Sequence, residues 1–377
     1  MPDSCVRDRE LMALALQLAA RGLYTTEPNP RVGCVLWRDG DVVGEGWHVR
    51  AGEGHAEVNA LAQAGDRARG ATAYVTLEPC SHFGRTPPCA DALVKAGVSR
   101  VVAAMQDPNP LVAGRGLERL RAAGIQVESG VLEDQARALN PGFIKRMQGG
   151  LPLVRLKLAM SLDGRTAMAS GESQWITGPD ARADVQRLRG RSGAVISGAD
   201  SVLQDDSALT LRPGEMGLEP EQLALIGDRQ PLRVLIDGRQ RVPLDRRLFR
   251  EAGPVLVVAA EARQALPDYS AVGAELLLLP DHSGQRVNLP GLLAELASRG
   301  CNEVLVETGA ALAGAFCRAG LVDELIVYMA PRLLGSRARP LLELPLDNMA
   351  QAMDMDITDV RAIGRDWRIT ARPVFPT

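Results

Sequence analysis

The chain has 377 residues, of which 46% are hydrophobic and 24% charged, and its formal net charge is −3. This length favours two or three domains of ordinary size. The slightly negative charge provides no general attraction to nucleic acid or to an anionic membrane, so local Arg and Lys side chains must hold any anionic substrate. No long apolar run predicts a membrane-spanning helix. The six irregularly spaced cysteines are not typical of a disulfide framework, and a reducing cytoplasm is the expected compartment.

The first 140 residues alternate between helix and strand patterns. A Leu- and Ala-rich run around 11–18 predicts a helix, and two apolar stretches joined by Asp39-Gly40 predict a hairpin. The expected elements after the first helix are strands at 32–37 and 42–49, a helix at 55–64, a strand at 73–77, a helix at 90–96, a strand at 100–105, a helix at 116–123 and a strand at 125–127. Strands separated by helices predict a sheet covered on both faces.

The segment Asn140-Pro141-Gly142, followed by Gly149-Gly150-Leu151-Pro152, interrupts this pattern. Clustered Gly and Pro residues indicate a boundary, so we expect domains at 1–147 and 148–377. The expected elements of the second domain are strands at 153–159, 194–197, 233–237, 255–258, 275–279, 303–307 and 324–329, with helices at 292–299 and 311–319. The stretches 212–230 and 280–290 are expected to be surface loops.

Four residues of the first domain form a pattern typical of zinc hydrolases. His55 and Glu57 stand where a helix should begin, Cys80 follows a strand, and Cys89 opens the next helix. One imidazole and two thiolates suit Zn²⁺ and leave a fourth position for water, whose pKa the metal lowers. Glu57 can then carry protons from the water to leaving ammonia. Because residues two apart do not share a helix face, His55 and Glu57 can both point inward only from the first turn.

A structural zinc site, or scattered core residues, is the alternative interpretation. The zinc-deaminase pattern is H-x-E followed by P-C-x-x-C, but here eight residues, 81–88, separate the cysteines. A structural site usually has four protein ligands. The nearest fourth candidate, Cys34, lies in an apolar strand and is expected in the core. The order of ligands, proton carrier and Pro-Cys turn favours a catalytic site.

These motifs resemble the deaminase half of the bifunctional riboflavin-biosynthesis family. The resemblance rests on His55-Ala56-Glu57, on Pro79-Cys80-Ser81-His82-Phe83-Gly84-Arg85-Thr86-Pro87-Pro88-Cys89 and on Asn29-Pro30-Arg31-Val32-Gly33-Cys34-Val35. It implies a three-layer cytidine-deaminase-like α/β fold, zinc on His55, Cys80 and Cys89, and Glu57 as the catalytic proton donor. The implied substrate is a diaminopyrimidinone ribosylamino 5′-phosphate that loses its 2-amino group to water.

Four other polar residues near these motifs have open roles. His82 and Arg85 either contact the substrate's ring or phosphate or only order the loop between the cysteines. Asn29 either hydrogen-bonds the pyrimidine or is a turn residue before a proline. His48, in a strand, is expected to be structural.

Three segments of the second domain, 156–177, 196–212 and 306–316, carry its chemistry. The last is a strand, a Gly turn and a helix, whose exposed N–H groups suit a pyrophosphate. It lacks G-x-G-x-x-G, so by itself it fits any tight turn and is not a Rossmann fingerprint. Together the three segments resemble the reductase half of the same family, which has a dihydrofolate-reductase-like fold. The order of the two halves is that of the bacterial fusion.

This second resemblance implies a reductase site that transfers hydride from NADPH to the opened ribosylamino group. The implied cofactor-binding residues are Ala159, Trp175, Ser201, Asp205, Gly238, Gly309, Ala310, Ala311, Leu312, Ala313, Gly314 and Ala315. The implied substrate-binding residues are Ser173, Arg189, Leu209, Arg212 and Glu307. The planar guanidinium groups of Arg189 and Arg212 suit a ribose 5-phosphate.

Some details of the reductase site stay open. Lys157 and Asp163 either polarise or protonate the sugar's C1 or form a salt bridge. The spacing does not distinguish NADPH from NADH, and Arg239 or a neighbour is the candidate to meet a 2′-phosphate. Ser207 and Thr308 stand where the family often has Pro and Gly or Ala, which leaves the loop geometry open.

Other classes of protein fit less well. A nucleic-acid deaminase with a binding domain predicts a basic face, many aromatic residues and short cysteine spacing, whereas this chain has 3% aromatic residues. A scaffold protein derived from the enzyme would usually have lost Glu57 or a ligand. One half could also be active and the other structural. The expected partners are therefore small phosphorylated pyrimidines, without nucleic acid or membrane, and the family expectation is a homodimer through the reductase half.

Overall fold

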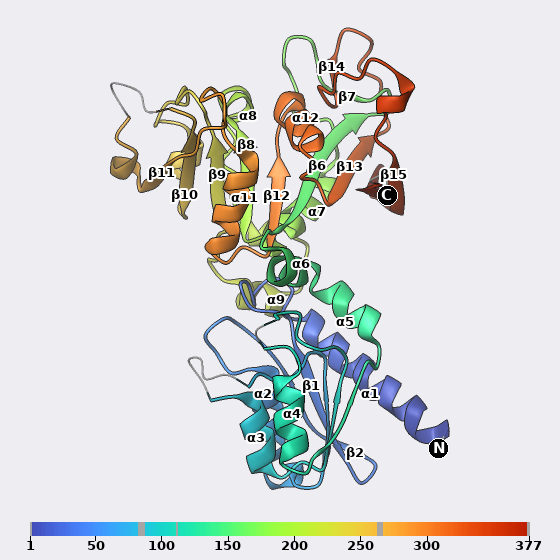
Figure 1. The fold of residues 1–377 in the computed structure, drawn as a ribbon. Coiled ribbons are helices and arrows are strands. Elements are labelled where there is room, and N and C mark those ends of the chain that lie inside the picture. Colours follow the sequence, from blue (N-terminus) through green and yellow to red (C-terminus); the bar gives the residue numbers. More distant parts are fainter. Residues whose placement is uncertain (1, 82–86, 111, 262–266, 375–377) are drawn as a thin grey trace. The chain divides into compact units, whose positions relative to one another are not determined.

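The computed structural model describes residues 2–81, 87–110, 112–261 and 267–374. The chain divides into two compact units, Met1–Gly150 and Leu151–Thr377 (Figure 1). The division falls inside the Gly-Gly-Leu-Pro run, three residues after the boundary expected from the sequence. Within the described ranges, no helix combines the length and apolar character that a bilayer crossing requires.

The first unit is a three-layer α/β/α structure. Its elements are α1 (Pro2–Ala20), β1 (Gly33–Arg38), β2 (Asp41–Trp47), α2 (Ala56–Ala64), a 3-10 turn (Gly65–Ala68), β3 (Thr72–Val75), α3 (Cys89–Ala96), β4 (Arg100–Ala103), α4 (Arg115–Ala122), β5 (Gln126–Ser129), α5 (Glu133–Leu139) and α6 (Pro141–Gly149). The sheet has the order β2-β1-β3-β4-β5, with the first two pairings antiparallel and the last two parallel. One apolar cluster lies between the sheet and α2, α3 and α4, and another between the sheet and α1, α5 and α6.

Two glycines of β2 bring α2 unusually close to the sheet. A Cβ on Gly44 or Gly46 would lie 2.3 Å from a backbone oxygen of α2, that of Ala60 or Ala56. The small residues of α2 face the sheet, and Ala56, Ala60 and Ala64 are buried. This close packing fixes the first turn of α2, which carries His55 and Glu57.

The expected break at Asn140-Pro141-Gly142 is in fact the start of a helix. Pro141 occupies the first position of α6, where its missing N–H leaves no helical hydrogen bond unmade. Asn140 is buried and pairs through its side-chain amide with the backbone N–H and C=O of Arg31, at 2.8 and 2.9 Å. The Gly pair at 149–150 ends α6, with Gly150 at φ +70°.

The second unit is built on one nine-stranded sheet. Its elements are β6 (Leu153–Ser161), β7 (Arg165–Ala167), α7 (Pro179–Arg191), β8 (Ala194–Gly198), α8 (Ala199–Asp205), α9 (Pro220–Ile226), β9 (Leu232–Ile236), α10 (Arg247–Arg250), β10 (Val255–Ala259), β11 (Ala274–Leu278), α11 (Leu289–Ser298), β12 (Glu303–Glu307), α12 (Ala310–Arg318), β13 (Glu324–Ala330), β14 (Arg339–Pro340), β15 (Met355–Ile363) and β16 (Asp366–Pro373), with 3-10 turns at Pro213–Glu215, Tyr269–Val272 and Met349–Gln351. The region 212–230, expected to be a loop, therefore contains α9 and a 3-10 turn.

The strand order of this sheet, β11-β10-β9-β8-β12-β6-β13-β16-β15, indicates where a ligand would bind. Neighbouring strands from β11 across to β13 in this spatial order are parallel, and β16 and β15 add an antiparallel edge. Helices α11 and α12 cover one face, while α7, α8 and α10 cover the other. Strand β12 follows β11 along the chain but inserts between β8 and β6. In open parallel sheets such a reversal of strand order is where ligands bind, at the carboxyl ends of the strands.

Candidate active sites

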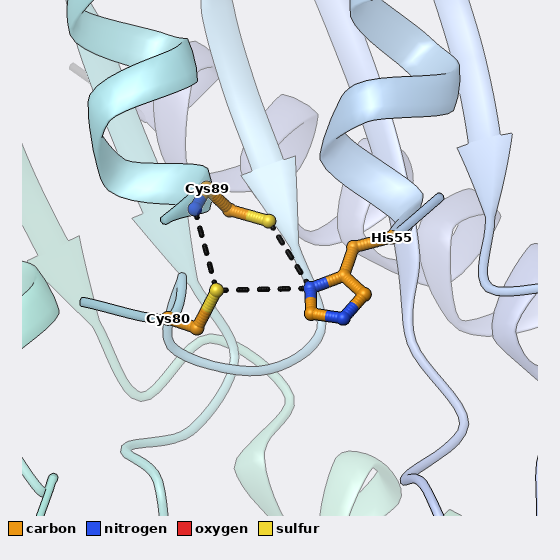
Figure 2. A group of neighbouring side chains, drawn as sticks. All are labelled: His55, Cys80 and Cys89. Carbon is orange, nitrogen blue, oxygen red and sulfur yellow. Dashed lines mark hydrogen bonds between the residues drawn. The ribbon is translucent and has the colours of Figure 1, made fainter. Parts of the chain in front are cut away.

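Three side chains of the first unit converge on one point (Figure 2). The ligand atoms of His55, Cys80 and Cys89 all lie within 4.8 Å of one another. His55 Nδ1 lies 3.2 Å from Cys89 Sγ and 3.7 Å from Cys80 Sγ, and the backbone N–H of Cys89 donates to Cys80 Sγ at 3.3 Å. One imidazole nitrogen and two sulfurs at this spacing are a donor set that fits Zn²⁺, and they leave a fourth position free for water.

The elements explain how distant residues meet here. His55 is the residue directly before α2, and Cys89 is the first residue of α3, so both lie at helix N-termini. Hydrogen bonds from the side chain and the backbone N–H of Cys89, at the start of α3, lower the pKa of Cys80 to about 4 and favour a thiolate there. The hydrogen bond to Cys80, together with burial, raises the pKa of Cys89. Glu57 is the second residue of α2. The pair therefore lies at the helix entry, the only arrangement in which His55 and Glu57 can both face the site.

Glu57 is the buried acid of this site. Its side chain is 3% exposed and lies beside the thiols of Cys80 and Cys89. Burial, followed by the negative charge of Cys80, raises the pKa of Glu57 to about 7. A carboxyl group in that range can both accept and release a proton near neutral pH.

Polar residues around the cluster support its geometry. The Glu78 carboxylate, two positions before Cys80, accepts from the backbone N–H groups of Asp107, Gly114 and Gly116 at 3.0, 2.9 and 2.8 Å. These bonds fix the segment after β3 that carries Cys80. No motif in the sequence indicated this role for Glu78. Cys34, the rival ligand, is fully buried in the core under α2.

Asn29 and His48 contact each other next to the cluster. Asn29 Nδ2 lies 3.0 Å from His48 Nε2, and His48 Nδ1 lies 3.1 Å from the Gly54 carbonyl oxygen. Burial lowers the pKa of His48. A neutral imidazole that donates from Nδ1 to Gly54 and accepts from Asn29 at Nε2 satisfies both contacts. His82 and Arg85, the other candidates of this unit, lie outside the described residues.

The second unit contains a cavity of about 600 Å³ at the carboxyl ends of its central strands. The second half of β6, the last residues of β8 and β12, and the loops that follow them line it. Its size is that of a small-molecule site. It includes the N-terminal turn of α12, where free backbone N–H groups suit a pyrophosphate.

Most of the residues expected at the reductase site line this cavity. Those that do are Ala159, Ser173, Trp175, Arg189, Ser201, Asp205, Leu209, Arg212, Glu307, Gly309, Ala310, Ala311 and Leu312. Gly238, Ala313, Gly314 and Ala315 are not among its lining residues. For α12 the reason is helical geometry, because Ala313 and Gly314 are buried toward the protein interior.

A buried ion pair lies at the base of the cavity. Arg189 Nε donates to Glu307 Oε1 at 2.6 Å, and Arg189 Nη2 donates to Oε2 at 3.1 Å. Lys157 Nζ lies 3.9 Å from the same carboxylate. Burial lowers the pKa of Lys157, whereas for Glu307 the charges of Arg189 and Lys157 outweigh burial and lower the pKa. Glu307 is thus an ionised acceptor between two cations.

Two candidates of the sequence analysis lie elsewhere. Asp163 is not a lining residue; its carboxylate accepts from Ser161 Oγ and from the backbone N–H groups of Leu334 and Gly335 at 3.1 and 2.8 Å. It therefore organises a loop. Arg239 is exposed and also absent from the cavity wall, whereas its neighbour Arg241 lines it.

Four further arginines line the cavity, and the sequence motifs did not indicate them. Arg182, Arg241, Arg247 and Arg339 line it, and the Arg182 guanidinium lies 4.7 Å from the ring centroid of Trp175. Because the chain is rich in arginine, only the fold distinguishes these residues from those on the outer surface. The cavity is therefore locally basic within an acidic protein, as binding of a phosphorylated ligand requires.

Comparisons with known proteins identify each unit. Residues 6–105 match the cytidine and deoxycytidylate deaminase zinc-binding region, and residues 152–369 match the RibD C-terminal domain. The fold and sites thus define a two-part enzyme, a zinc deaminase joined to a reductase, which confirms the fold class predicted from the sequence.

Full-length relatives identify the family. The chain is 52% identical to the riboflavin biosynthesis protein RibD of Escherichia coli, over 96% of this chain and 98% of that protein. It is 48% identical to the Acinetobacter baumannii RibD structure, with a TM-score of 0.90 over 98% of this chain and all of that one. A Thermotoga maritima structure described as a diaminohydroxyphosphoribosylaminopyrimidine deaminase/5-amino-6-(5-phosphoribosylamino)uracil reductase is 31% identical, with a TM-score of 0.85 over 98% and 100% of the two chains. The chain belongs to the RibD family of bifunctional riboflavin biosynthesis enzymes.

Proposed function

We propose that the first unit deaminates diaminohydroxyphosphoribosylaminopyrimidine and that the second reduces the ribosyl group of the product, 5-amino-6-(5-phosphoribosylamino)uracil, to ribityl. The Thermotoga relative is described by these two substrates. The observation that carries the proposal is that one chain contains two sites. One is a His-Cys-Cys cluster with a buried acid beside it, and the other is a separate, arginine-rich cavity. Ammonia release followed by oxidation of the reduced coenzyme tests it.

In the first unit, His55, Cys80 and Cys89 would hold zinc. The metal supplies a bound water of lowered pKa as nucleophile. Glu57 takes a proton from that water and delivers it to the departing 2-amino group, so that water and an amine become a carbonyl and ammonia. Its buried position excludes bulk water from this transfer. Asn29, whose side-chain Nδ2 lies 3.0 Å from His48 Nε2, would hydrogen-bond the pyrimidine edge.

In the second unit, Ser173, Leu209, Arg212, Arg189 and Glu307 would bind the sugar phosphate. Bound NADPH supplies the hydride for the sugar's C1. The Lys157 ammonium, whose pKa burial lowers, releases the proton that completes the reduction, while the Glu307 carboxylate holds Lys157 and Arg189 in place. Arg212 Nε donates to the exposed Glu215 carboxylate at 2.7 Å. Because an exposed ion pair contributes little to stability, Arg212 would exchange it for the 5′-phosphate, for which a planar guanidinium is suited.

We propose that Arg241 makes this site prefer NADPH over NADH. Arg241 lines the cavity close to Ser201, and its Nη2 donates to the exposed Asp200 carboxylate at 2.8 Å. An exposed ion pair of this kind contributes little to stability, so the 2′-phosphate of NADPH can compete with Asp200 for the guanidinium. Replacement of Arg241 by Ala is expected to raise the KM for NADPH about tenfold, the size of one lost charge-assisted contact, and to leave the KM for NADH unchanged.

Two variants sharpen the coenzyme experiment. Asp200→Asn removes the nearer of two carboxylates that face Arg241, the other being Asp237 at 3.9 Å, and is expected to lower the KM for NADPH. Arg239→Ala removes an exposed guanidinium two positions away and should change neither KM. Equal use of NADH and NADPH by the unaltered protein would contradict the coenzyme assignment itself, whereas an unaltered preference in Arg241→Ala would contradict only the role of this residue.

We also propose a homodimer formed through the reductase unit. The edge strand β15 exposes Ile357 and Val360, and the adjoining β16 exposes Trp367. An exposed apolar edge strand is a ready template for pairing with a second copy. Light scattering should give twice the 40.3 kDa of the chain. The double variant Ile357→Lys and Val360→Lys should give the mass of one chain; a monomer before substitution contradicts the proposal.

A further inference from the structure

One wall of the reductase cavity is a segment without regular secondary structure, 207–212. It carries Leu209 and Arg212, which the proposed function assigns to the substrate. Leu209 adopts a φ of +56°, in the left-handed region that costs energy for any residue with a Cβ. Such a conformation persists only when the surroundings hold it.

Two side-chain amides hold this segment. Gln230 Oε1 accepts from the backbone N–H of Leu211, and Gln230 Nε2 donates to the backbone C=O of the same residue, both at 2.9 Å. Gln186 Oε1, buried on α7, accepts from the backbone N–H of Arg212 at 3.0 Å. The Gln230 side chain thereby makes the same pair of hydrogen bonds with the Leu211 backbone that a residue of an adjacent antiparallel strand would make.

Gln230 is not among the residues that line the cavity, whereas Gln186 is. Arg189, which donates to the Thr210 carbonyl oxygen at 2.8 Å, lines the cavity itself. The stem of Gln230 packs on Gly253, where a Cβ would lie 2.9 Å from the Gln230 Cβ. This packing leaves the amide little freedom, so its two bonds define where Leu211 lies.

We propose that Gln230 is a positioning residue of the reductase, which aims the guanidinium of Arg212 at the substrate phosphate by fixing the main chain of Leu211. The inference rests on the proposed function, in which Arg212 binds that phosphate. Leu211 is 2% exposed, so water cannot replace the lost hydrogen bonds. Loss of the amide therefore loosens the segment and weakens phosphate binding, while the base of the cavity, with Glu307 and Lys157, is unaffected.

Two substitutions of Gln230 test this role. Gln230→Leu removes both bonds, and the nearly isosteric Gln230→Glu keeps the acceptor for the Leu211 N–H but sets a carboxylate oxygen against the Leu211 C=O. Each is expected to raise the KM of the phosphorylated substrate about tenfold, as expected for loss of a buried hydrogen-bonded pair, with kcat within about threefold. The KM of the analogue without phosphate should not change. Gln285→Leu, at an exposed glutamine of the loop before α11, is the matched control and should leave the KM unchanged.

A double-mutant cycle with Arg212→Ala separates positioning from general damage. When Arg212 is absent, Gln230→Glu is expected to have no further effect on the KM. If Gln230→Glu raises the KM by the same factor with and without Arg212, the inference is wrong. It is also wrong if Gln230→Glu raises the KM of the analogue without phosphate equally. If Arg212→Ala raises the KM and the Gln230 variants do not, only the inference fails. If Arg212→Ala leaves the KM unchanged, the proposed role of Arg212 fails first and the inference falls with it. The KM for NADPH and the thermal unfolding midpoint show that each variant is folded.

Discussion

Replacement of Glu57 by Gln is expected to abolish ammonia release and to leave zinc bound. Glutamine has nearly the same shape but cannot carry a proton, and general acid–base catalysis contributes about 10²–10⁴ in rate. Because Glu57 both takes a proton from water and returns it to the amine, kcat should fall by about 10³ or more. The measurement is ammonia release at saturating substrate, alongside the metal content of the purified variant.

The control for this variant is Glu53→Gln. Glu53 is an exposed carboxylate four positions earlier, so its loss should leave the deamination rate unchanged. Reduction of the already deaminated intermediate should proceed at the same rate in both variants, because it belongs to the second unit. A Glu57→Gln protein that retains a tenth or more of the deaminase rate would contradict the proton-carrier role.

Replacement of Glu307 by Gln is expected to be the most damaging single change in the reductase. It removes the negative charge between Arg189 and Lys157 and leaves two cations without their carboxylate. Removal of one partner from a buried pair costs about 3–5 kcal/mol. If that loss is borne by the transition state, kcat/KM falls by about 10²–10⁴. The measurement is NADPH oxidation with the deaminated intermediate as substrate.

A double substitution tests whether this loss is catalytic or structural. Arg189→Met with Glu307→Leu removes both charges and is expected to restore much of the stability that Glu307→Gln loses, without restoring the reductase rate. Glu295→Gln alters a more exposed ion pair between Glu295 of α11 and Arg299, the residue directly after this helix. This variant should leave both the stability and the reductase rate unchanged. Recovery of the rate in the double variant would mean that Glu307 and Arg189 act only in folding.

The alternation of strands and helices could be predicted where apolar residues form continuous runs. The hydrophobic strand at 303–307 coincides with β12, and the apolar run at 311–319 differs from α12 by one residue at each end. Helix α7 was missed because its 13 residues are mostly polar, and only Ala181, Val185 and Leu188 turn apolar side chains to the core. Strand β15 was missed because it is largely exposed.

The sites could be predicted where residue type alone restricts the chemistry. A His-x-Glu and two cysteines are rare and specific, and the fold brings the three ligand atoms together. Arginines and glutamines carry no such restriction. Arg241 was one of many similar residues, and Gln230 lay in a stretch expected to be a loop. Their positions depend on long-range packing between α8, β9 and segment 207–212, which no local pattern encodes.

The most direct test is to incubate the protein with diaminohydroxyphosphoribosylaminopyrimidine, with and without NADPH, and to follow ammonia and NADPH together. The two activities of one chain predict that ammonia appears without NADPH and that NADPH oxidation then follows with a lag. The Glu57→Gln protein should show neither, yet should oxidise NADPH when given the deaminated intermediate. Prompt oxidation of NADPH in that variant without any ammonia would contradict the proposed order of the two reactions.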